Sequence, residues 1–235
     1  MLYSVEEIHI QDVAFQVKTY LKDTRNHNYR IRGNNIGITI PAFYKSKVEI
    51  EKFKAEWIDN AIARIESEPR LLTRKPLVER KSITVLGIAY SIEYLEEIFR
   101  PKFIPNSKKI QFPTSYDSPK IRAYLSSFVQ KNFQIAIEQR VSFINQITVQ
   151  KTLNSISIKS HKSRWGSCSS KGDVTISINT LLAPRWVLDY VIVHELCHRV
   201  YMDHSPKFWA EVARYFPKYA LAKKLLKDRG TEFSL

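Results

Sequence analysis

Three of the six histidines in this chain lie within the eleven-residue segment HELCHRVYMDH. His194 and His198 are four residues apart, so on a helix their imidazoles lie about 40° apart on one face and can share a tetrahedral zinc ion. Glu195 directly follows the first of them, which completes an H-E-x-x-H pattern. In that pattern the glutamate is not a ligand; it accepts a proton from metal-bound water and passes it to the leaving group. The spacing predicts metal-assisted hydrolysis with Zn²⁺ as the cofactor.

A third histidine, His204, lies six residues beyond the second, which is about 240° around an ideal helix. It can reach the metal only if the helix ends near residues 201–203 and the chain turns back. Ser205 and Pro206 provide an N-cap followed by proline at the first helical position, which predicts such a break. Three neutral imidazoles would leave the charge of the metal uncancelled and its fourth position open.

Two other interpretations of these histidines remain. His194 and His198 can be buried, hydrogen-bonded histidines, with His204 on the surface. A structural zinc site is disfavoured, because such sites usually close the fourth position with cysteine, and Cys197 points about 100° away from the second ligand. The segment WVLDYVIVHELCH is apolar nearly all round, as expected of a helix buried at the centre of a domain.

The elements that must position these side chains follow from periodicity and capping. In residues 1–41, apolar and polar side chains alternate, which predicts a small antiparallel β unit with a hairpin turn at 33–35. Ser46 begins a helix that runs to about residue 66. Residues 82–110 indicate two or three more strands, with a weak turn signal at 87–88.

The second half of the chain is expected to hold the functional elements. A helix begins with Ser118 as N-cap and Pro119 and continues to about residue 147. Strands at 155–159 and 174–179 follow, joined by the loop HKSRWGSCSSKGD. The helix that carries His194 and His198 is expected to run from Pro184 to about Tyr201. Further helices begin near residues 205–206 and 217–218. The fold class is α+β, divided into a β-rich region with one helix at 1–116 and a second domain at 117–235.

Composition excludes several classes of protein. Of the 235 residues, 44% are hydrophobic and 12% aromatic, which is too high for a disordered chain. Two cysteines cannot form a disulfide framework, and no 18-residue apolar run is present. The first residues, MLYSVEEIHIQD, do not resemble a secretory leader, so we expect none. We expect a soluble cytoplasmic protein with no membrane contact.

The net charge of +14 is concentrated in the second half. Residues 1–100 hold 16 basic and 14 acidic side chains, whereas residues 101–235 hold 21 and 9. A basic surface attracts polyanions, so the second half could contact nucleic acid or a nucleotide. The charge could equally serve solubility alone, and both interpretations stay open.

Further candidate residues lie close to these motifs. Arg164 and Trp165 could bind an oxyanion, a phosphate or a base, or could simply pack against the site and brace it. Tyr201 or Tyr190 could donate a hydrogen bond to an oxyanion, and spacing does not choose between them. The candidate substrate-binding residues are Arg164, Asn179 and Tyr201.

Other side chains are expected to support the triad. Phe208 and Trp209 lie one turn into the helix that follows the third histidine, so they are expected to be core anchors that fix it. The imidazoles need carboxylate or carbonyl acceptors, for which Asp203 and Glu211 are candidates.

Several motifs together resemble the YgjP-like metallopeptidase family. They are KSRWGSC at 162–168, ISINTLL at 176–182, AP at 183–184, VIVHELCH at 191–198 and DHSPKFW at 203–209, together with TRNHNYRIRGNNIGITIP at 24–41. The resemblance spans nearly the whole chain. It implies a zincin-like domain related to the SprT-like and WLM-type proteases, with zinc on the three histidines and Glu195 as general base. The ligand spacing equals that of metzincins, but Tyr201 stands where they have glycine and no methionine follows residue 202.

In zincins, a strand placed like 174–179 lies beside the cleft. If this strand has an exposed edge, an extended peptide could pair with it by main-chain hydrogen bonds. The alternative is a core strand with no free edge.

The leading interpretation is a zinc metallopeptidase that hydrolyses peptide or protein substrates. A zinc-dependent nucleotide phosphohydrolase is an alternative, although no glycine-rich phosphate loop is present. A DNA-associated protease or binding protein of the SprT-like type is the third.

Overall fold

Two compact units make up the computed structural model, residues 1–75 and residues 76–235. The structure describes residues 1–10, 13–32, 35–44, 46–68, 77–161 and 163–235, without the side chains of residues 13 and 32. The expected boundary at 116/117 does not coincide with this division, because the sheet before residue 117 shares one hydrophobic core with the helix after it. The α+β class is confirmed.

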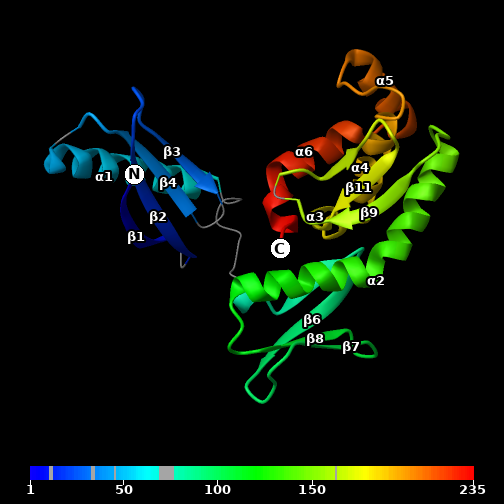
Figure 1. Ribbon diagram of the computed structural model, residues 1–235, viewed down its shortest axis with the longest axis horizontal. Helices are drawn as coiled ribbons and strands as arrows, with labels where there is room; N and C mark the ends of the chain where they lie inside the picture. Colours follow the sequence, from blue (N-terminus) through cyan, green and yellow to red (C-terminus); the bar gives the residue numbers. More distant parts are fainter. Residues whose placement is uncertain (11–12, 33–34, 45, 69–76, 162) are drawn as a thin grey trace. The chain divides into compact units, whose positions relative to one another are not determined.

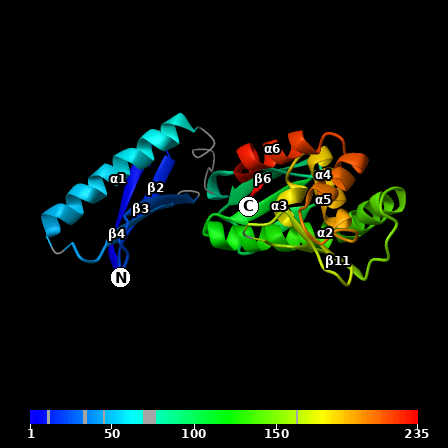
Figure 2. The same ribbon diagram turned by 90° about the horizontal axis from the view of Figure 1, so that it is seen from above.

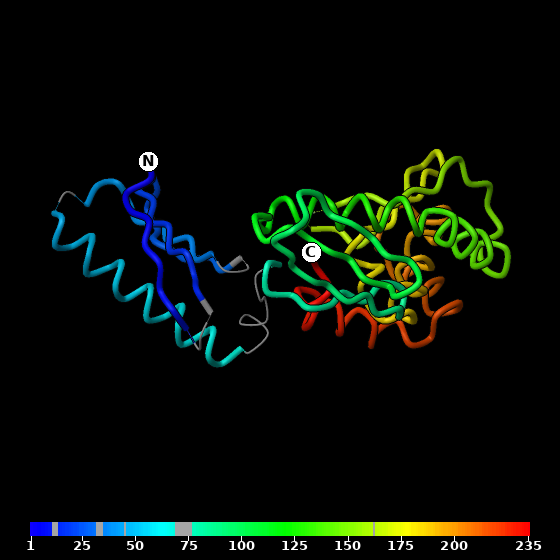
Figure 3. Tube along the Cα trace, turned by 90° about the horizontal axis from the view of Figure 1, so that it is seen from below, coloured from blue at the N-terminus to red at the C-terminus, as the bar shows by residue number. Residues whose placement is uncertain are grey.

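The first unit is a four-stranded sheet with one helix on one face (Figures 2 and 3). Its elements are β1 (Leu2–Ile10), β2 (Val13–Lys22), β3 (Asn28–Arg32), β4 (Asn35–Pro41) and α1 (Lys47–Ser67). The strand order is β1-β2-β4-β3; the β3-β4 hairpin is antiparallel as predicted, and β1 and β2 form a second antiparallel pair. The sheet as a whole is mixed, because β2 and β4 pair in parallel. Of the predicted turn at 33–35, residues 33–34 lie outside the described residues.

In the second unit, the long helix α2 lies between two sheets (Figure 1). The elements are η2 (Leu77–Glu79), β5 (Ser82–Val85), β6 (Ile88–Leu95), β7 (Lys102–Ile104), β8 (Lys109–Pro113), α2 (Ser118–Ile147), β9 (Ser155–Lys159), β10 (Gly166–Cys168), β11 (Asp173–Ser177), α3 (Ile178–Leu181), α4 (Arg185–Cys197), α5 (Pro206–Tyr215), α6 (Tyr219–Arg229) and η3 (Gly230–Phe233). Rings from the β5-β6-β8-β7 sheet pack on α2, with Tyr90 against Phe128 and Phe112 against Tyr124. Where the sequence predicted two or three strands, four form.

The start of α2 differs from the prediction by one residue. Asp117 is the N-cap, and its carboxylate accepts a hydrogen bond from the Lys120 N–H at 2.9 Å. Ser118 and Pro119 therefore occupy the first turn. An aspartate carboxylate is as good a cap as a serine hydroxyl, and proline is tolerated in the first turn, where no N–H is needed.

The β10-β11-β9 sheet corrects two predictions about the strand expected at 174–179. The strand β11 ends at Ser177, and Asn179 lies in the short helix α3. This strand is also central, antiparallel to β10 and parallel to β9, so it has no free edge for a peptide. The loop that the sequence suggested contains the edge strand β10, which at three residues is too short to show a period-two pattern.

The two edges of this sheet differ in whether their main-chain groups have hydrogen-bond partners. Along β9, side-chain amides of α2 take the place of another strand: Gln134 accepts from the Ile158 N–H at 3.1 Å and donates to the Ile156 carbonyl at 2.7 Å. Gln130 donates to the Ile158 carbonyl at 3.0 Å. Among the described residues, no strand pairs with the outer edge of β10.

The helix α4 is buried at the centre of the second unit, as predicted, where it packs against both the small sheet and the other helices. Arg140 of α2 holds Asp189 of α4 by two hydrogen bonds of 2.7 and 2.6 Å. None of the described helices is long and apolar enough to cross a membrane.

Candidate metal centre

The last turn of α4 carries His194 and Glu195, and His198 is its C-cap. This helix ends at Cys197, one turn before the predicted end near residue 201. The next main-chain hydrogen bonds span three residues instead of four, with the His198 N–H donating to the Glu195 carbonyl at 3.2 Å. The final turn is therefore tightened, as is common where a helix ends. The two imidazoles nevertheless stay together, with ring centroids 5.0 Å apart.

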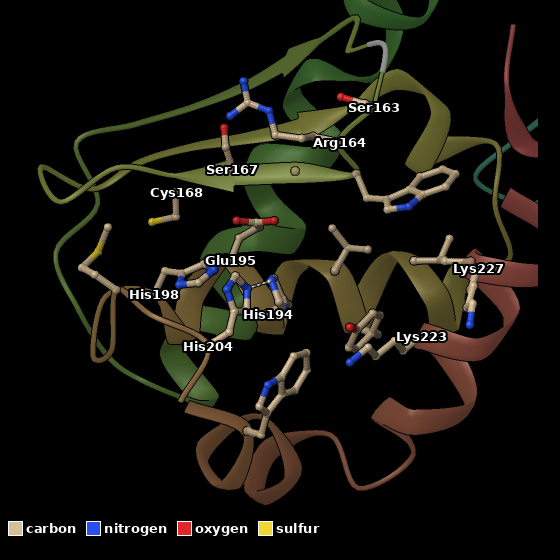
Figure 4. Close-up of a pocket in the computed structure, with 17 residues that line it drawn as sticks. Ser163, Arg164, Ser167, Cys168, His194, Glu195, His198, His204, Lys223 and Lys227 are labelled. Atoms are coloured by element: carbon tan, nitrogen blue, oxygen red, sulfur yellow. Dashed lines mark hydrogen bonds between the residues drawn. The ribbon is translucent and has the colours of Figure 1, made fainter. Parts of the chain in front are cut away.

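The chain turns back after α4, as the third ligand requires. Asp203 accepts a hydrogen bond from the Ser205 N–H at 3.0 Å, and Ser205 accepts from the Phe208 N–H at 3.4 Å. Ser205 is thus the N-cap of α5, as predicted. His204 sits within this turn, and its ring centroid lies 5.1 Å from that of His194 (Figure 4).

The three histidines can hold one metal ion. One nitrogen atom from each of His194, His198 and His204 lies within 4.8 Å of the others. The Nε2 atoms of His194 and His204 are 3.2 Å apart. Two nitrogen ligands at tetrahedral zinc, each about 2.0–2.1 Å from the ion, are about 3.3 Å apart. The donor atoms therefore suit a metal ion such as zinc, and the His194–His204 spacing matches that expected of two zinc ligands.

Neighbouring groups fix the orientation of His198. Its Nδ1 lies 3.0 Å from the Tyr201 carbonyl oxygen, so Nδ1 carries the proton and Nε2 is left for the metal. The buried ring of Phe208 stacks on the His198 imidazole at 4.6 Å and also contacts His204, which it was expected to fix, edge-on at 4.9 Å. The acceptor is a carbonyl: among the described residues, neither Asp203 nor Glu211 hydrogen-bonds a histidine of the triad.

Burial favours the neutral form of two of the ligands, His194 and His198. Burial lowers the pKa of His194 to about 3, and the neighbouring imidazoles and the Lys223 ammonium act in the same direction. Burial also lowers the pKa of His198. A neutral imidazole is the form that binds a metal. The Nδ1 of His194 is buried without a hydrogen-bond partner among the described residues, and its Nε2 is the nitrogen that lies 3.2 Å from His204 Nε2.

Glu195 is a buried carboxylate with no compensating partner. Its side chain is only 5% exposed, and no hydrogen bond or ion pair holds it within the described part of the chain. Burial raises its pKa to about 8, against an opposing effect of Arg164. The carboxylate lies between the three imidazoles and the strand that carries Ser167 and Cys168 (Figure 4). Such an unpaired buried acid is costly and is typical of a catalytic site.

A glycine makes room for this carboxylate. A Cβ atom at Gly166 of β10 would lie 2.7 Å from Glu195 Oε1 and 2.8 Å from its Cγ. Real side chains do not approach so closely, so only glycine lets the strand pass over the glutamate. Sequence reasoning did not identify this residue, because the contact joins two segments that are distant in the chain.

A family model described as the YgjP-like, metallopeptidase domain matches residues 25–229. The chain belongs to the YgjP-like family. Its resemblance to that family, drawn from the motifs, is confirmed. Among solved structures, the chain is similar to the metallopeptidase zymogen of Pyrococcus abyssi abylysin, with 25% identity over 41% of this chain and 93% of that chain and a TM-score of 0.36. None of the curated proteins matches the chain.

In this YgjP-like chain, the histidines and Glu195 line a cavity of about 630 Å³. One side of the cavity is the β10 segment, and the opposite sides come from α4, α5 and α6. Tyr190, one turn before His194 on α4, also lines it. Burial raises the pKa of Tyr190 to about 12, so its phenol keeps its proton.

The three predicted substrate-binding residues have different places in this YgjP-like fold. Arg164 lines the cavity, although its side chain points away from the histidines in Figure 4. Asn179 does not; its Oδ1 accepts a hydrogen bond from the Leu235 N–H at 3.4 Å. Tyr201 is also outside the lining and acts through its carbonyl on His198. Of the two tyrosines left open, Tyr190 is the one at the cavity.

Two lysines of α6 line the cavity, although the sequence did not predict that they belong to the site. Lys223 and Lys227 line the cavity, and the Lys223 ammonium lies 4.2 Å from the centre of the Trp209 ring. Their spacing of four residues places them on one helical face, which the sequence shows. Which neighbour that face meets depends on the tertiary fold, so spacing alone did not connect them to the site.

Proposed function

We propose that this metallopeptidase domain is a zinc-dependent peptidase in which Glu195 is the general base. The observation that carries the proposal is a buried, unpaired carboxylate beside three converging imidazoles at an open cavity. Zinc held by His194, His198 and His204 would polarise the substrate carbonyl and lower the pKa of a water molecule. The family supports the peptide bond as the bond that is cleaved.

Glu195 moves the proton. Its carboxylate accepts a proton from the attacking water and then donates it to the nitrogen of the leaving amine. Burial raises the pKa of Glu195, whereas the positive charge of a bound metal ion would lower it, so the carboxylate form would be available as the base. Gly166 has no side chain, so nothing on this strand displaces the carboxylate from its position.

Tyr190 stabilises the oxyanion. It lies on the same face of α4 as His194, with ring centroids 6.0 Å apart, and it lines the cavity. With a pKa of about 12 the phenol is protonated, so it can donate a hydrogen bond to the oxygen on which negative charge develops.

The substrate pairs with the outer edge of β10. In the pairing with β11, the Ser177 N–H donates to the Trp165 carbonyl and the Ser169 N–H donates to the Asp173 carbonyl. Hydrogen-bonded residues alternate along an antiparallel pair, so the main-chain groups of Gly166 and Cys168 point to the open edge. An extended peptide bound there lies above Glu195 and the triad. N-methylation of the peptide at alternate residues should slow cleavage, whereas N-methylation at the residues between them should have little effect. Equal effects at all positions would exclude edge pairing.

The direct test compares the wild type with Glu195→Gln after metal analysis. We expect about one zinc per chain in both, and a loss of about 10³-fold in cleavage of an unfolded polypeptide by the variant. Glu211→Gln is the matched control, because Glu211 is close to the site but does not line the cavity. Cleavage by metal-free protein, or full activity in the Glu195 variant, would refute the proposal.

The same proteins should also be tested with DNA and with nucleoside triphosphates. Residues 101–235 carry the excess of basic side chains, so stimulation of cleavage by DNA would favour a nucleic-acid contact over a role in solubility alone. Hydrolysis of the triphosphates without any cleavage of polypeptide would favour the phosphohydrolase alternative over a peptidase.

A further inference from the structure

The α6 wall of the cavity has a defined pattern. Lys223, Leu226 and Lys227 all line the cavity, and their spacing places them on one face of the helix (Figure 4). Lys224 does not line it and instead pairs with Asp228 at 2.6 Å. The helix thus presents two ammonium groups with an apolar side chain between them to the space beside the metal centre.

The charges that line the cavity are unbalanced. Its cationic side chains are Arg164, Lys223 and Lys227, and its one carboxylate in the described lining is Glu195, which the proposed mechanism uses as a base. Neither lysine forms an ion pair with a described carboxylate. A metal ion bound to the three neutral imidazoles would add two further positive charges. Substrates with a negative charge are therefore favoured electrostatically in this cavity.

Lys223 contacts an aromatic side wall of the cavity. Its ammonium lies 4.2 Å from the centre of the Trp209 ring, a cation–π contact. Trp209 in turn stacks on Tyr219 with ring centroids 5.5 Å apart. The tryptophan also lines the cavity, so the space between the triad and the two ammonium groups has apolar sides formed by Trp209 and Leu226. A short methylene chain that ends in a carboxylate would contact the apolar sides with its methylene groups and the two ammonium groups with its carboxylate.

We propose that Lys223 and Lys227 form a carboxylate-binding subsite that sets the specificity of the peptidase. The preferred substrates are peptides with a carboxylate beside the cleaved bond, either on an acidic side chain or at a free C-terminus. This inference rests on the proposed function, since it assigns the substrate class of the same site.

The test measures kcat/KM for matched peptide pairs. One pair has Glu or Gln beside the cleaved bond and a blocked C-terminus; the other has a neutral sequence with a free or amidated C-terminus. We expect the wild type to prefer the carboxylate member of one pair by tenfold or more, since a hydrogen bond to a charged group contributes about that much. The pair that shows the preference identifies the source of the carboxylate.

Lysine variants then locate the subsite. Lys223→Met and Lys227→Met should each reduce the carboxylate preference about tenfold. Lys223→Glu should reverse it toward peptides with a lysine at that position. Lys224→Met is the matched control, with the same substitution on another face of the same helix, and should keep the wild-type preference. Equal kcat/KM values within both pairs, or a preference that the two cavity lysines do not affect, would overturn the subsite.

A binding measurement separates this inference from the proposed function. Calorimetric titration of zinc-supplied Glu195→Gln with the same peptides needs no turnover. Tighter binding of the carboxylate peptide, lost in the double variant with Lys223→Met, supports the subsite even if the wild type cleaves nothing. Lysine-dependent binding of a nucleoside triphosphate without any preference among the peptides would overturn it in favour of a phosphate ligand.

Discussion

The two helical walls of the cavity differ in how their side chains are held. On α4, Tyr190 and Glu195 are each 5% exposed, and His198 at its C-terminal end is oriented by the Tyr201 carbonyl and by the ring of Phe208. On α6, Lys223 and Lys227 are exposed, and Lys223 contacts the ring of Trp209. Burial restricts the movement of the α4 side chains, as bond-making chemistry requires. The exposed wall offers charge on flexible stems, which suits selection of a substrate.

This comparison predicts unequal effects of substitution. Changes on the α4 side should reduce turnover for every peptide, whereas changes on α6 should alter the ratio between peptides. A change that alters both properties equally would remove the distinction between the two walls.

The largest effect in this series is expected for Gly166→Ala. The new Cβ would lie 2.7 Å from Glu195 Oε1, so the carboxylate must move. Displacement of a catalytic group by about 1 Å costs about 10²-fold in kcat. Zinc content should not change, because the three ligands do not contact this position. The measurements are steady-state cleavage and metal analysis.

Gly37→Ala is the control for that substitution. Gly37 also lies in a strand, and its nearest neighbour to a new Cβ is the Arg30 carbonyl at 3.9 Å, an ordinary contact. It should retain wild-type cleavage. Full activity in Gly166→Ala would show that the position of Glu195 is not critical, contrary to the role of the buried wall.

A smaller effect is expected for Tyr190→Phe. Loss of one hydrogen bond to a charged oxygen should lower kcat about 30-fold and change KM little. Tyr124→Phe, which removes a hydroxyl from a ring packed between α2 and β8, is the control. A fall in affinity without a fall in kcat would assign Tyr190 to binding of the ground state instead of the oxyanion.

The smallest effect is expected where α4 is attached to α2. Arg140→Met breaks both hydrogen bonds to Asp189 and should lower the free energy of unfolding by about 1–2 kcal/mol. Urea denaturation measures this loss. Because the pair lies outside the cavity lining, kcat should stay near that of the wild type. A large fall in kcat at unchanged stability would mean that turnover depends on this anchor.

Sequence reasoning identified the buried wall and missed the exposed one, for a physical reason. The ligands on α4 and the Ser205-Pro206 cap are local patterns whose geometry follows from helix periodicity. The contacts that place Gly166 over Glu195, and α6 beside the triad, join segments that are distant in the chain. Such contacts depend on how the elements pack together.

The strand predictions illustrate the same limit. The strand at 155–159 was found with its observed bounds, because its apolar residues alternate clearly. The three residues of β10 show no such pattern and form a strand only because β11 pairs with them. The assignment of a free edge to residues 174–179 was therefore wrong, and the open edge belongs to β10.

The most direct test of the central claim is anomalous diffraction at the zinc absorption edge from crystals of the zinc-supplied protein. The account predicts one strong peak per chain, about 2.0–2.1 Å from a nitrogen of each of His194, His198 and His204, with the Glu195 carboxylate outside bonding distance of the ion. An ion held by any other set of residues, or by Glu195 itself as a ligand, would contradict it.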